Sequence, residues 1–138
     1  MIEYDKFKQS LKHLELQFNN YDTLDSTLPE LIKEAVSESV IQRFETCYDC
    51  MWKVLKRYLF DELGIPEVPN SPKPILRLAN ENRLFSSPIE QWLAYADART
   101  ATSHDYSGEK AKAALNLMKG YIDDAIALYQ TMSNTSWK

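Results

Sequence analysis

The sequence predicts an all-α fold, specifically an antiparallel up-and-down four-helix bundle with one extra short helix. Apolar residues recur every three or four positions along most of the 138 residues, which is the spacing of one helix face. The chain has three glycines and lacks the alternating apolar–polar runs of half-buried strands. Hydrophobic residues make up 44% of the chain and charged residues 26%, so one domain can bury a core of its own. We expect that domain over residues 1–132 and a frayed tail over residues 133–138.

The first two predicted helices are the long elements of the bundle. The first runs from about residue 3 to residue 20, and its inward stripe consists of Tyr4, Phe7, Leu11, Leu14 and Phe18. The second begins near the cap candidates Ser26 and Thr27 and runs to Leu63. Two adjacent apolar stripes over residues 41–59 make this helix suited to more than one neighbour. A second subunit could be one of those neighbours.

Three further helices follow a proline-rich crossover. Ser71 and Pro72 begin a short helix, and Pro88 begins the next, because proline suits the first turn of a helix. The last helix is predicted from about Glu109 to Met132. Its inward positions are Ala114, Met118, Tyr121, Ala125, Leu128 and Met132.

The charge balance limits the classes of partner. A formal net charge of -4 and a pI near 5.2 disfavour a general nucleic-acid coat, since that binding depends on neutralising phosphates. The most basic stretch includes Arg43 and Lys53, which form either a solvated face or a small contact surface for phosphate or RNA. No apolar run is long enough for a membrane span, and the acidic N-terminus differs from a signal peptide. We therefore expect a cytoplasmic protein with no membrane partner.

Cys47 and Cys50 form a lone C-x-x-C inside the long helix. A structural zinc site needs four ligands, and the two histidines, His13 and His104, have no suitable spacing to this pair. A redox motif of this kind would follow a strand. We interpret the pair as two reduced core thiols and expect neither a metal nor a cofactor.

The segment from Arg99 to Tyr106, Arg-Thr-Ala-Thr-Ser-His-Asp-Tyr, has the strongest chemical content. Arg99 continues the apolar stripe of its helix, and a charge on that line needs a partner, an interface or a ligand phosphate. His104 lies about 140° round a regular helix from Arg99. Either the helix ends between the two residues, or two copies of the segment meet across an interface.

Arginine grips phosphate oxygens through two nitrogens, and histidine transfers protons near neutral pH. A cation and a proton carrier together are suited to cleavage of a phosphodiester. The alternative interpretation is structural, with Arg99 an ordinary surface charge and His104 neutralising the C-terminal dipole of its helix.

The R-x4-H-x-Y spacing, with the segments 40–49 and 52–59, Ser71-Pro72 and Trp92-Leu93 in the same order, resembles HEPN-domain proteins. The resemblance is to the toxin subunits paired with minimal nucleotidyltransferases, also described as nucleotidyltransferase substrate-binding proteins. That family usually has asparagine after the motif arginine, where this chain has Thr100. Any contact that the asparagine side chain makes in the family is therefore in question here.

The resemblance implies a HEPN-like bundle over residues 1–132 that forms a homodimer with its motifs facing. It implies that Arg99 and His104 are the pair of a metal-independent ribonuclease acting on RNA. It also implies that a partner nucleotidyltransferase, the antitoxin subunit, adenylylates Tyr106 and silences the toxin. Two alternatives stay open, namely a non-catalytic subunit that binds a nucleotide or substrate for the nucleotidyltransferase, and a helical dimer with a degenerate site.

Overall fold

The computed structural model describes residues 1–105 and 108–138, and within them every regular element is a helix. The elements are α1 (Asp5–Asp22), α2 (Glu30–Asp61), α3 (Pro72–Glu81), α4 (Ile89–Thr102) and α5 (Glu109–Ser133). The all-α prediction is confirmed, with α3 as the extra short helix.

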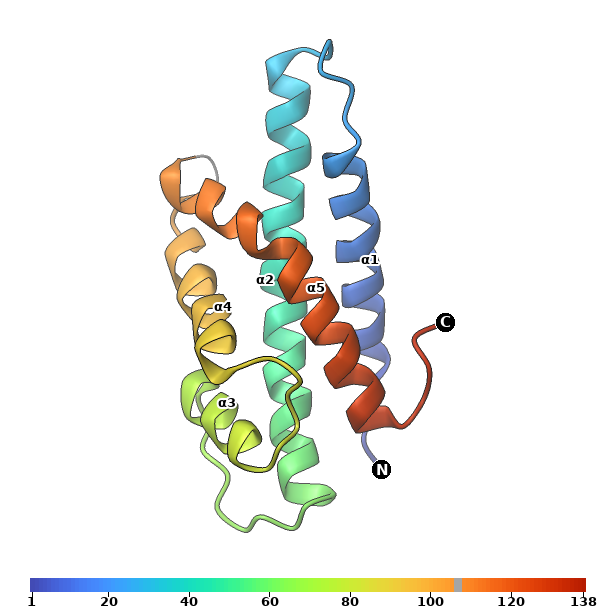
Figure 1. Cartoon of the computed structure of the whole chain (residues 1–138), viewed down its shortest axis with the longest axis vertical. Helices are drawn as coiled ribbons and strands as arrows, with labels where there is room; N and C mark the ends of the chain where they lie inside the picture. The colour runs from blue at the N-terminus through green and yellow to red at the C-terminus, as the bar shows by residue number, and fades with distance from the viewer. Residues whose placement is uncertain (106–107) are drawn as a thin grey trace.

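Helix α2 is the axis around which the other helices are arranged (Figure 1). Helix α1 runs beside it in the opposite direction, and α5 crosses obliquely over α2 and contacts α1, α2 and α4. Helices α3 and α4 lie on the other side of α2 and contact each other. The middle of α2 is therefore the place where segments far apart in the sequence meet.

The predicted inward stripes form the core. In α1 the side chains of Phe7, Leu11 and Leu14 are buried. Both stripes of α2 are buried over most of their length by the other helices of the same chain. Trp52 and Tyr58 stay partly exposed. The width of this apolar face is thus largely explained by packing within the chain and does not by itself require a second subunit.

The ends of α2 differ from the prediction. The helix begins at Glu30, after Pro29, and no side chain caps its first turn. The Thr27 hydroxyl donates to Asp25 Oδ1 at 2.7 Å, so the predicted capping by Ser26 or Thr27 is wrong. The Thr27 side chain is used in a local turn instead, and such local hydrogen bonds commonly compete with helix capping. At the other end Gly64 has a φ of 69°, a conformation that glycine adopts without a steric penalty.

A partly buried polar network joins α4 to α5. The Tyr95 hydroxyl donates to Asp124 Oδ2 at 2.5 Å, and the Ser87 hydroxyl donates to Asp124 Oδ1 at the same distance. The amide of Gln91 donates to the Tyr95 oxygen at 3.0 Å. These bonds fix the rotation of α4 about its axis, and α4 carries the segment that begins at Arg99.

The segment after α5 differs from the frayed tail that we expected. The Trp137 indole nitrogen donates to Glu15 Oε1 at 3.3 Å, and its ring packs edge-on against Tyr129 at 5.4 Å. The ammonium of Lys12 lies 5.5 Å from the centre of the same ring. The aromatic ring of Trp137 supplies the attachment to α1 and α5 that composition alone did not indicate.

The helices of the described residues also bear on the membrane prediction. None of them combines the length and the apolar character that crossing a bilayer requires.

Candidate functional site

Arg99 lies in the last turn of α4 and reaches across to α2. Its Nε and Nη2 atoms donate to the two carboxylate oxygens of Asp49, at 3.3 and 3.1 Å. Its Nη1 atom donates to Glu45 Oε2 at 3.2 Å. The stripe of α4 that points inward through Trp92 and Ala96 brings the arginine to this position. The sequence indicated that Arg99 needs a partner in the chain, an interface or a ligand phosphate. In the structure its partners are two acidic residues of the same chain.

The two carboxylates differ in their surroundings. The Glu45 side chain is 11% exposed, whereas that of Asp49 is 41% exposed. Glu45 Oε2 also accepts a hydrogen bond from the buried Thr102 hydroxyl at 2.9 Å. Glu45 is therefore a nearly buried residue held by two hydrogen bonds. Asp49 lies at the solvent edge of the site, where ion pairs contribute little to stability.

Sequence reasoning missed Glu45, Asp49 and Thr102. The available signal was the i, i+4 spacing of Glu45 and Asp49, which places two acids on one face of the long helix next to its apolar stripes. A lone arginine on an inward stripe of another helix is the complement of such a pair. The pairing of Arg99 with these two acids depends on how α4 packs against α2, which the sequence pattern does not give.

Helix α4 ends at Thr102, between Arg99 and His104. The backbone N–H groups of Ser103 and Asp105 donate to the carbonyls of Thr100 and Thr102, at 3.3 and 3.2 Å. The structure thus shows the first predicted arrangement, in which the helix ends between Arg99 and His104. His104 lies outside the helix, so the helical angle of about 140° from Arg99 does not apply to it. The His104 side chain is exposed.

The turn after α4 is held by Asp105, whose Oδ1 accepts the backbone N–H of Gly108 at 2.9 Å. A β-carbon at Gly108 would lie 2.6 Å from Asp105 Oδ2, so a larger residue there would displace this carboxylate. Tyr106, the residue predicted to be modified, lies outside the described residues.

The two predicted phosphate-binding residues occupy different hollows. Arg43 is exposed and shares a polar hollow of about 530 Å³ with Glu45, Asp49 and Arg99. Lys53 is exposed and lies in a separate hollow between α1 and α2, with its ammonium 6.0 Å from the Trp52 ring centre. The structure therefore brings Arg43, but not Lys53, to the hollow that contains Arg99.

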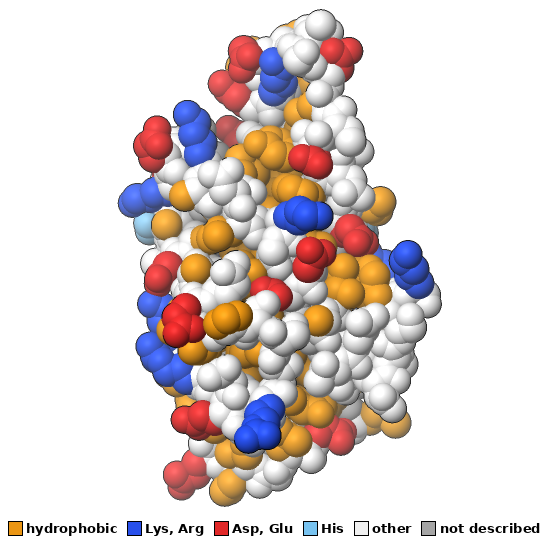
Figure 2. Space-filling model, viewed as in Figure 1, with side chains coloured by type: hydrophobic (Ala, Val, Ile, Leu, Met, Phe, Trp, Pro, Cys, Tyr) orange, Lys and Arg blue, Asp and Glu red, His pale blue; other side chains and the backbone are white. Residues whose placement is uncertain are grey.

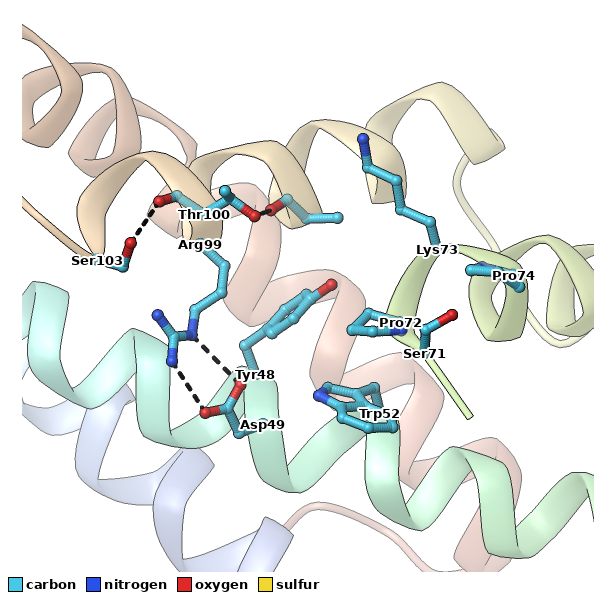
Figure 3. A pocket seen from close by; sticks show the side chains of 11 residues that line it. Tyr48, Asp49, Trp52, Ser71, Pro72, Lys73, Pro74, Arg99, Thr100 and Ser103 are labelled. Carbon is cyan, nitrogen blue, oxygen red and sulfur yellow. Dashed lines mark hydrogen bonds and ion pairs between the residues drawn. The ribbon is translucent and has the colours of Figure 1, made fainter. Parts of the chain in front are cut away.

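A second hollow next to Arg99, of about 580 Å³, lies between α2, the start of α3 and the end of α4 (Figure 3). Tyr48, Trp52, Pro72, Pro74 and Ala96 provide most of its apolar surface. Thr100, the departure from the family pattern, lines its edge and donates its hydroxyl to the Ala96 carbonyl at 3.2 Å.

The cysteines are both free thiols, Cys47 buried and Cys50 half-buried. Burial raises the pKa of Cys47 to about 12, and the Tyr121 hydroxyl donates to its sulfur at 3.4 Å. Among the residues that the structure describes, no group of three or more His, Cys, Asp or Glu side chains is arranged to hold a metal ion.

Comparison with known proteins assigns the family. The family model described as "Nucleotidyltransferase substrate binding protein like" matches residues 2–134. The chain belongs to this family. The resemblance drawn from the R-x4-H-x-Y segment and the helix pattern is therefore confirmed.

The chain is similar to a Haemophilus influenzae protein named "Probable ribonuclease HepT", with 32% identity over 106 residues. The match covers 75% of this chain and 71% of that protein. The structure of Haemophilus influenzae HI0074, described as the fold of a substrate binding domain of a nucleotidyltransferase, is 27% identical with a TM-score of 0.72. That match covers 94% of this chain and 96% of HI0074.

A Thermus thermophilus protein of known structure is 26% identical with a TM-score of 0.71, over 93% of this chain and 96% of its own. The fold described above is thus shared with both solved structures over nearly their whole length.

Proposed function

We propose that this chain is the toxin subunit of a toxin–antitoxin module and an endoribonuclease that acts through Arg99 and His104. The end of α4 between these two residues carries the proposal, because it releases the exposed His104 from the regular helical offset of about 140° that would direct it away from Arg99. The relative named as a probable ribonuclease adds support at the level of the family.

The chemistry follows from the two side chains. A ribose 2′-hydroxyl attacks the adjacent phosphorus and the bond to the 5′-oxygen breaks, which leaves a 2′,3′-cyclic phosphate and a 5′-hydroxyl. One imidazole accepts the proton of the 2′-hydroxyl and a second, protonated imidazole donates a proton to the leaving oxygen. The guanidinium of Arg99 stabilises the negative charge that develops on the phosphate oxygens. These groups supply every proton and charge of the step without a metal ion.

One His104 per chain supplies one imidazole, so the mechanism needs a second copy. A two-fold dimer brings two identical segments together. Light scattering should give twice the mass of the monomer at micromolar concentration, and a stable monomer would overturn this part of the proposal.

Figure 2 shows acidic and basic side chains interspersed over the face that α5 crosses, without a continuous basic surface on that face. RNA contact through this face alone would be weak, since non-specific affinity follows the number of phosphates neutralised. This distribution supports a local contact at the hollow that Arg43 shares with Arg99. Lys53 would add a contact further along the backbone of a longer RNA.

Regulation is proposed at Tyr106. The partner nucleotidyltransferase would catalyse attack of the tyrosine oxygen on the α-phosphorus of ATP, with pyrophosphate leaving and the phenolic proton lost to solvent. The adenylyl group adds an anion two residues from His104 and seven from Arg99. An anion there competes with the RNA phosphate for the guanidinium, which silences the toxin.

The test compares purified wild type with His104→Ala, Arg99→Lys and His13→Ala on a mixed-sequence RNA in the presence of EDTA. Loss of a general acid–base group should reduce cleavage roughly 10²–10⁴-fold in His104→Ala. Arg99→Lys should also be slow, because a point charge cannot reproduce the two-nitrogen grip. His13 is an exposed histidine on α1 and serves as the matched control. Equal cleavage by wild type and His104→Ala would overturn the proposal.

A second candidate is a non-catalytic subunit that binds a nucleotide or acceptor for the nucleotidyltransferase. The two hollows that Arg99 lines favour it, because a ligand phosphate could bind the guanidinium there without any need for His104. Under this interpretation, Arg99→Ala loses nucleotide binding, His104→Ala keeps it, and no variant cleaves RNA.

The proposed adenylylation is tested separately, by intact-mass measurement after incubation with the partner, ATP and Mg²⁺. Wild type should gain an adenylyl adduct, and Tyr106→Phe should lose it.

A further inference from the structure

The hollow between α2, α3 and α4, which we call the Trp52 pocket, is not used by the mechanism above. Its volume is about 580 Å³, and Figure 3 shows Tyr48 and Trp52 rising from α2 towards Pro72 at the start of α3. Arg99 closes one end from α4. The cavity is therefore continuous with the residue that we propose to hold phosphate.

The walls of the Trp52 pocket suit a flat, partly apolar group. Trp52 is half-buried, so part of its indole is open to the cavity, and Pro72 and Pro74 provide further apolar surface. Nucleobases stack on aromatic side chains irrespective of base identity. The volume accommodates one base with its ribose.

The Tyr48 hydroxyl is the second observation that points to a ligand. Tyr48 is 2% exposed, and its oxygen makes no hydrogen bond among the described residues. Figure 3 shows this oxygen directed to the space between α4 and Pro72. Burial raises the pKa of Tyr48, so the hydroxyl keeps its proton and can donate as well as accept. A buried polar atom without a partner is uncommon and costly, and a base edge would supply that partner.

The remaining polar groups of the Trp52 pocket define its two ends. The ammonium of Lys73 pairs with Asp97 at 2.6 Å, so this lysine is already neutralised. The Ser103 hydroxyl donates to the Thr100 carbonyl at 2.7 Å, which leaves its oxygen able to accept from a ribose hydroxyl. The cation at the other end is Arg99. Figure 3 shows Arg99 between Trp52 and Ser103, so a nucleotide whose base lies on Trp52 directs its phosphate to Arg99, and Ser103 lies beyond it on the side of the next ribose.

We propose that the Trp52 pocket binds the base of an RNA nucleotide whose phosphate lies at Arg99, with Trp52 stacking on the base and the Tyr48 hydroxyl bonding its edge. The proposal rests on the proposed ribonuclease function for its substrate. It adds that the enzyme prefers particular bases next to the bond that it cleaves. A free nucleotide shares the same chemistry, and the two arms of the test separate it from RNA.

The first arm measures binding of the four nucleoside 3′-monophosphates by intrinsic fluorescence and calorimetry, with no cleavage needed. Trp52→Leu keeps an apolar side chain and should weaken binding roughly tenfold or more, because stacking is lost. Tyr48→Phe should change the ranking of the four bases, and its fold should persist because the hydroxyl has no partner to lose. Trp137→Leu and Tyr58→Phe, which lie outside the Trp52 pocket, are the matched controls and should bind as wild type does. Unchanged affinity in Trp52→Leu overturns the proposal.

The second arm measures cleavage of an RNA that contains every dinucleotide step. Trp52→Leu should raise KM with little change in kcat and flatten the base preference next to the cut. If wild type cleaves and Trp52→Leu keeps both KM and preference, the Trp52 pocket is not the base site, while the ribonuclease proposal stands. If wild type binds nucleotides through Trp52 and cleaves nothing, the ribonuclease proposal fails and the ligand is a free nucleotide.

Discussion

Arg99 and Asp49, fifty residues apart in the sequence, form a two-nitrogen to two-oxygen ion pair with distances of 3.3 and 3.1 Å. This is the geometry in which arginine also binds phosphate. A phosphate at Arg99 must therefore replace the Asp49 carboxylate or share the guanidinium with it. Asp49 is an internal competitor of the proposed substrate.

The competition predicts that Asp49→Asn binds RNA more tightly than wild type. The amide keeps the shape of the side chain but loses the charge that opposes phosphate, so affinity should increase several-fold, up to about tenfold for about 1.4 kcal/mol. Fluorescence anisotropy in a His104→Ala background measures binding without cleavage. Glu30→Gln, which removes an acid paired with Lys33 at the start of α2 and away from both hollows, is the control. Weaker binding by Asp49→Asn would show that the aspartate helps to hold the arginine for the ligand.

Glu45 should matter more for stability than Asp49 does. Its Oε2 accepts from both Arg99 and Thr102, so Glu45→Ala removes a charged acceptor that the guanidinium and the buried Thr102 hydroxyl share. We expect a loss of about 2–3 kcal/mol in the free energy of unfolding. Asp49→Ala, at a half-exposed position, should cost less than about 1 kcal/mol. Urea unfolding monitored by circular dichroism measures both, and equal losses would contradict the distinction.

Two buried tyrosines offer a matched pair of hydroxyl deletions. The Tyr95 hydroxyl donates to Asp124 at 2.5 Å, whereas the Tyr48 hydroxyl has no partner among the described residues. Tyr95→Phe should lower the free energy of unfolding by about 1–3 kcal/mol, because a bond to a charged group is lost. Tyr48→Phe should leave it unchanged or raise it. Thermal melts of the two variants side by side decide the matter.

Alkaline pH should destabilise the fold. The pKa of Cys47 is raised by burial from 9.0 to about 12, and that of Tyr4 is raised from 10.0 to about 12, chiefly by burial. Between pH 9 and pH 12 the unfolded chain releases protons that the folded chain retains. The free energy of unfolding must then fall as pH rises through this window, while below pH 9 these groups add no slope.

Urea midpoints measured across this pH window test the prediction. Cys47→Ala should flatten part of the alkaline slope relative to wild type. An identical slope in Cys47→Ala and wild type would exclude Cys47 as a source.

The tail contacts predict that Trp137→Ala destabilises the chain. The substitution removes the packing on Tyr129 and the hydrogen bond to Glu15. A partly buried aromatic side chain of this kind contributes about 1–2 kcal/mol. A melting temperature equal to that of wild type would indicate that residues 133–138 fray as composition first indicated.

Much of the fold could be predicted from the sequence because helix periodicity is a local signal. The stripe of α1 and the two stripes of α2 gave the inward residues directly. The start of α2 could not be predicted, because Thr27 has a competing partner in Asp25 that only the turn geometry reveals. The attachment of Trp137 depends on α1, more than a hundred residues away.

The candidate site was predictable only in part. The inward position of Arg99 indicated that it needs a partner, and the chain supplies Glu45 and Asp49 from α2. The identity of those partners depends on how α4 is rotated against α2, which the Tyr95–Asp124 bond helps to set. Periodicity contains no information about such rotation. The open face of Trp52 and the lone Tyr48 hydroxyl depend on the same packing.

Asp49 projects from the middle of the longest helix, where the backbone is fixed by the core on both sides. Its carboxylate can leave Arg99 only by rotation of the side chain. Rotamer changes of exposed side chains take picoseconds to nanoseconds, far faster than loop or domain movements. Exchange of one anion for another at Arg99 therefore adds no slow opening step, and the arrival of a phosphate would be governed by diffusion to the site.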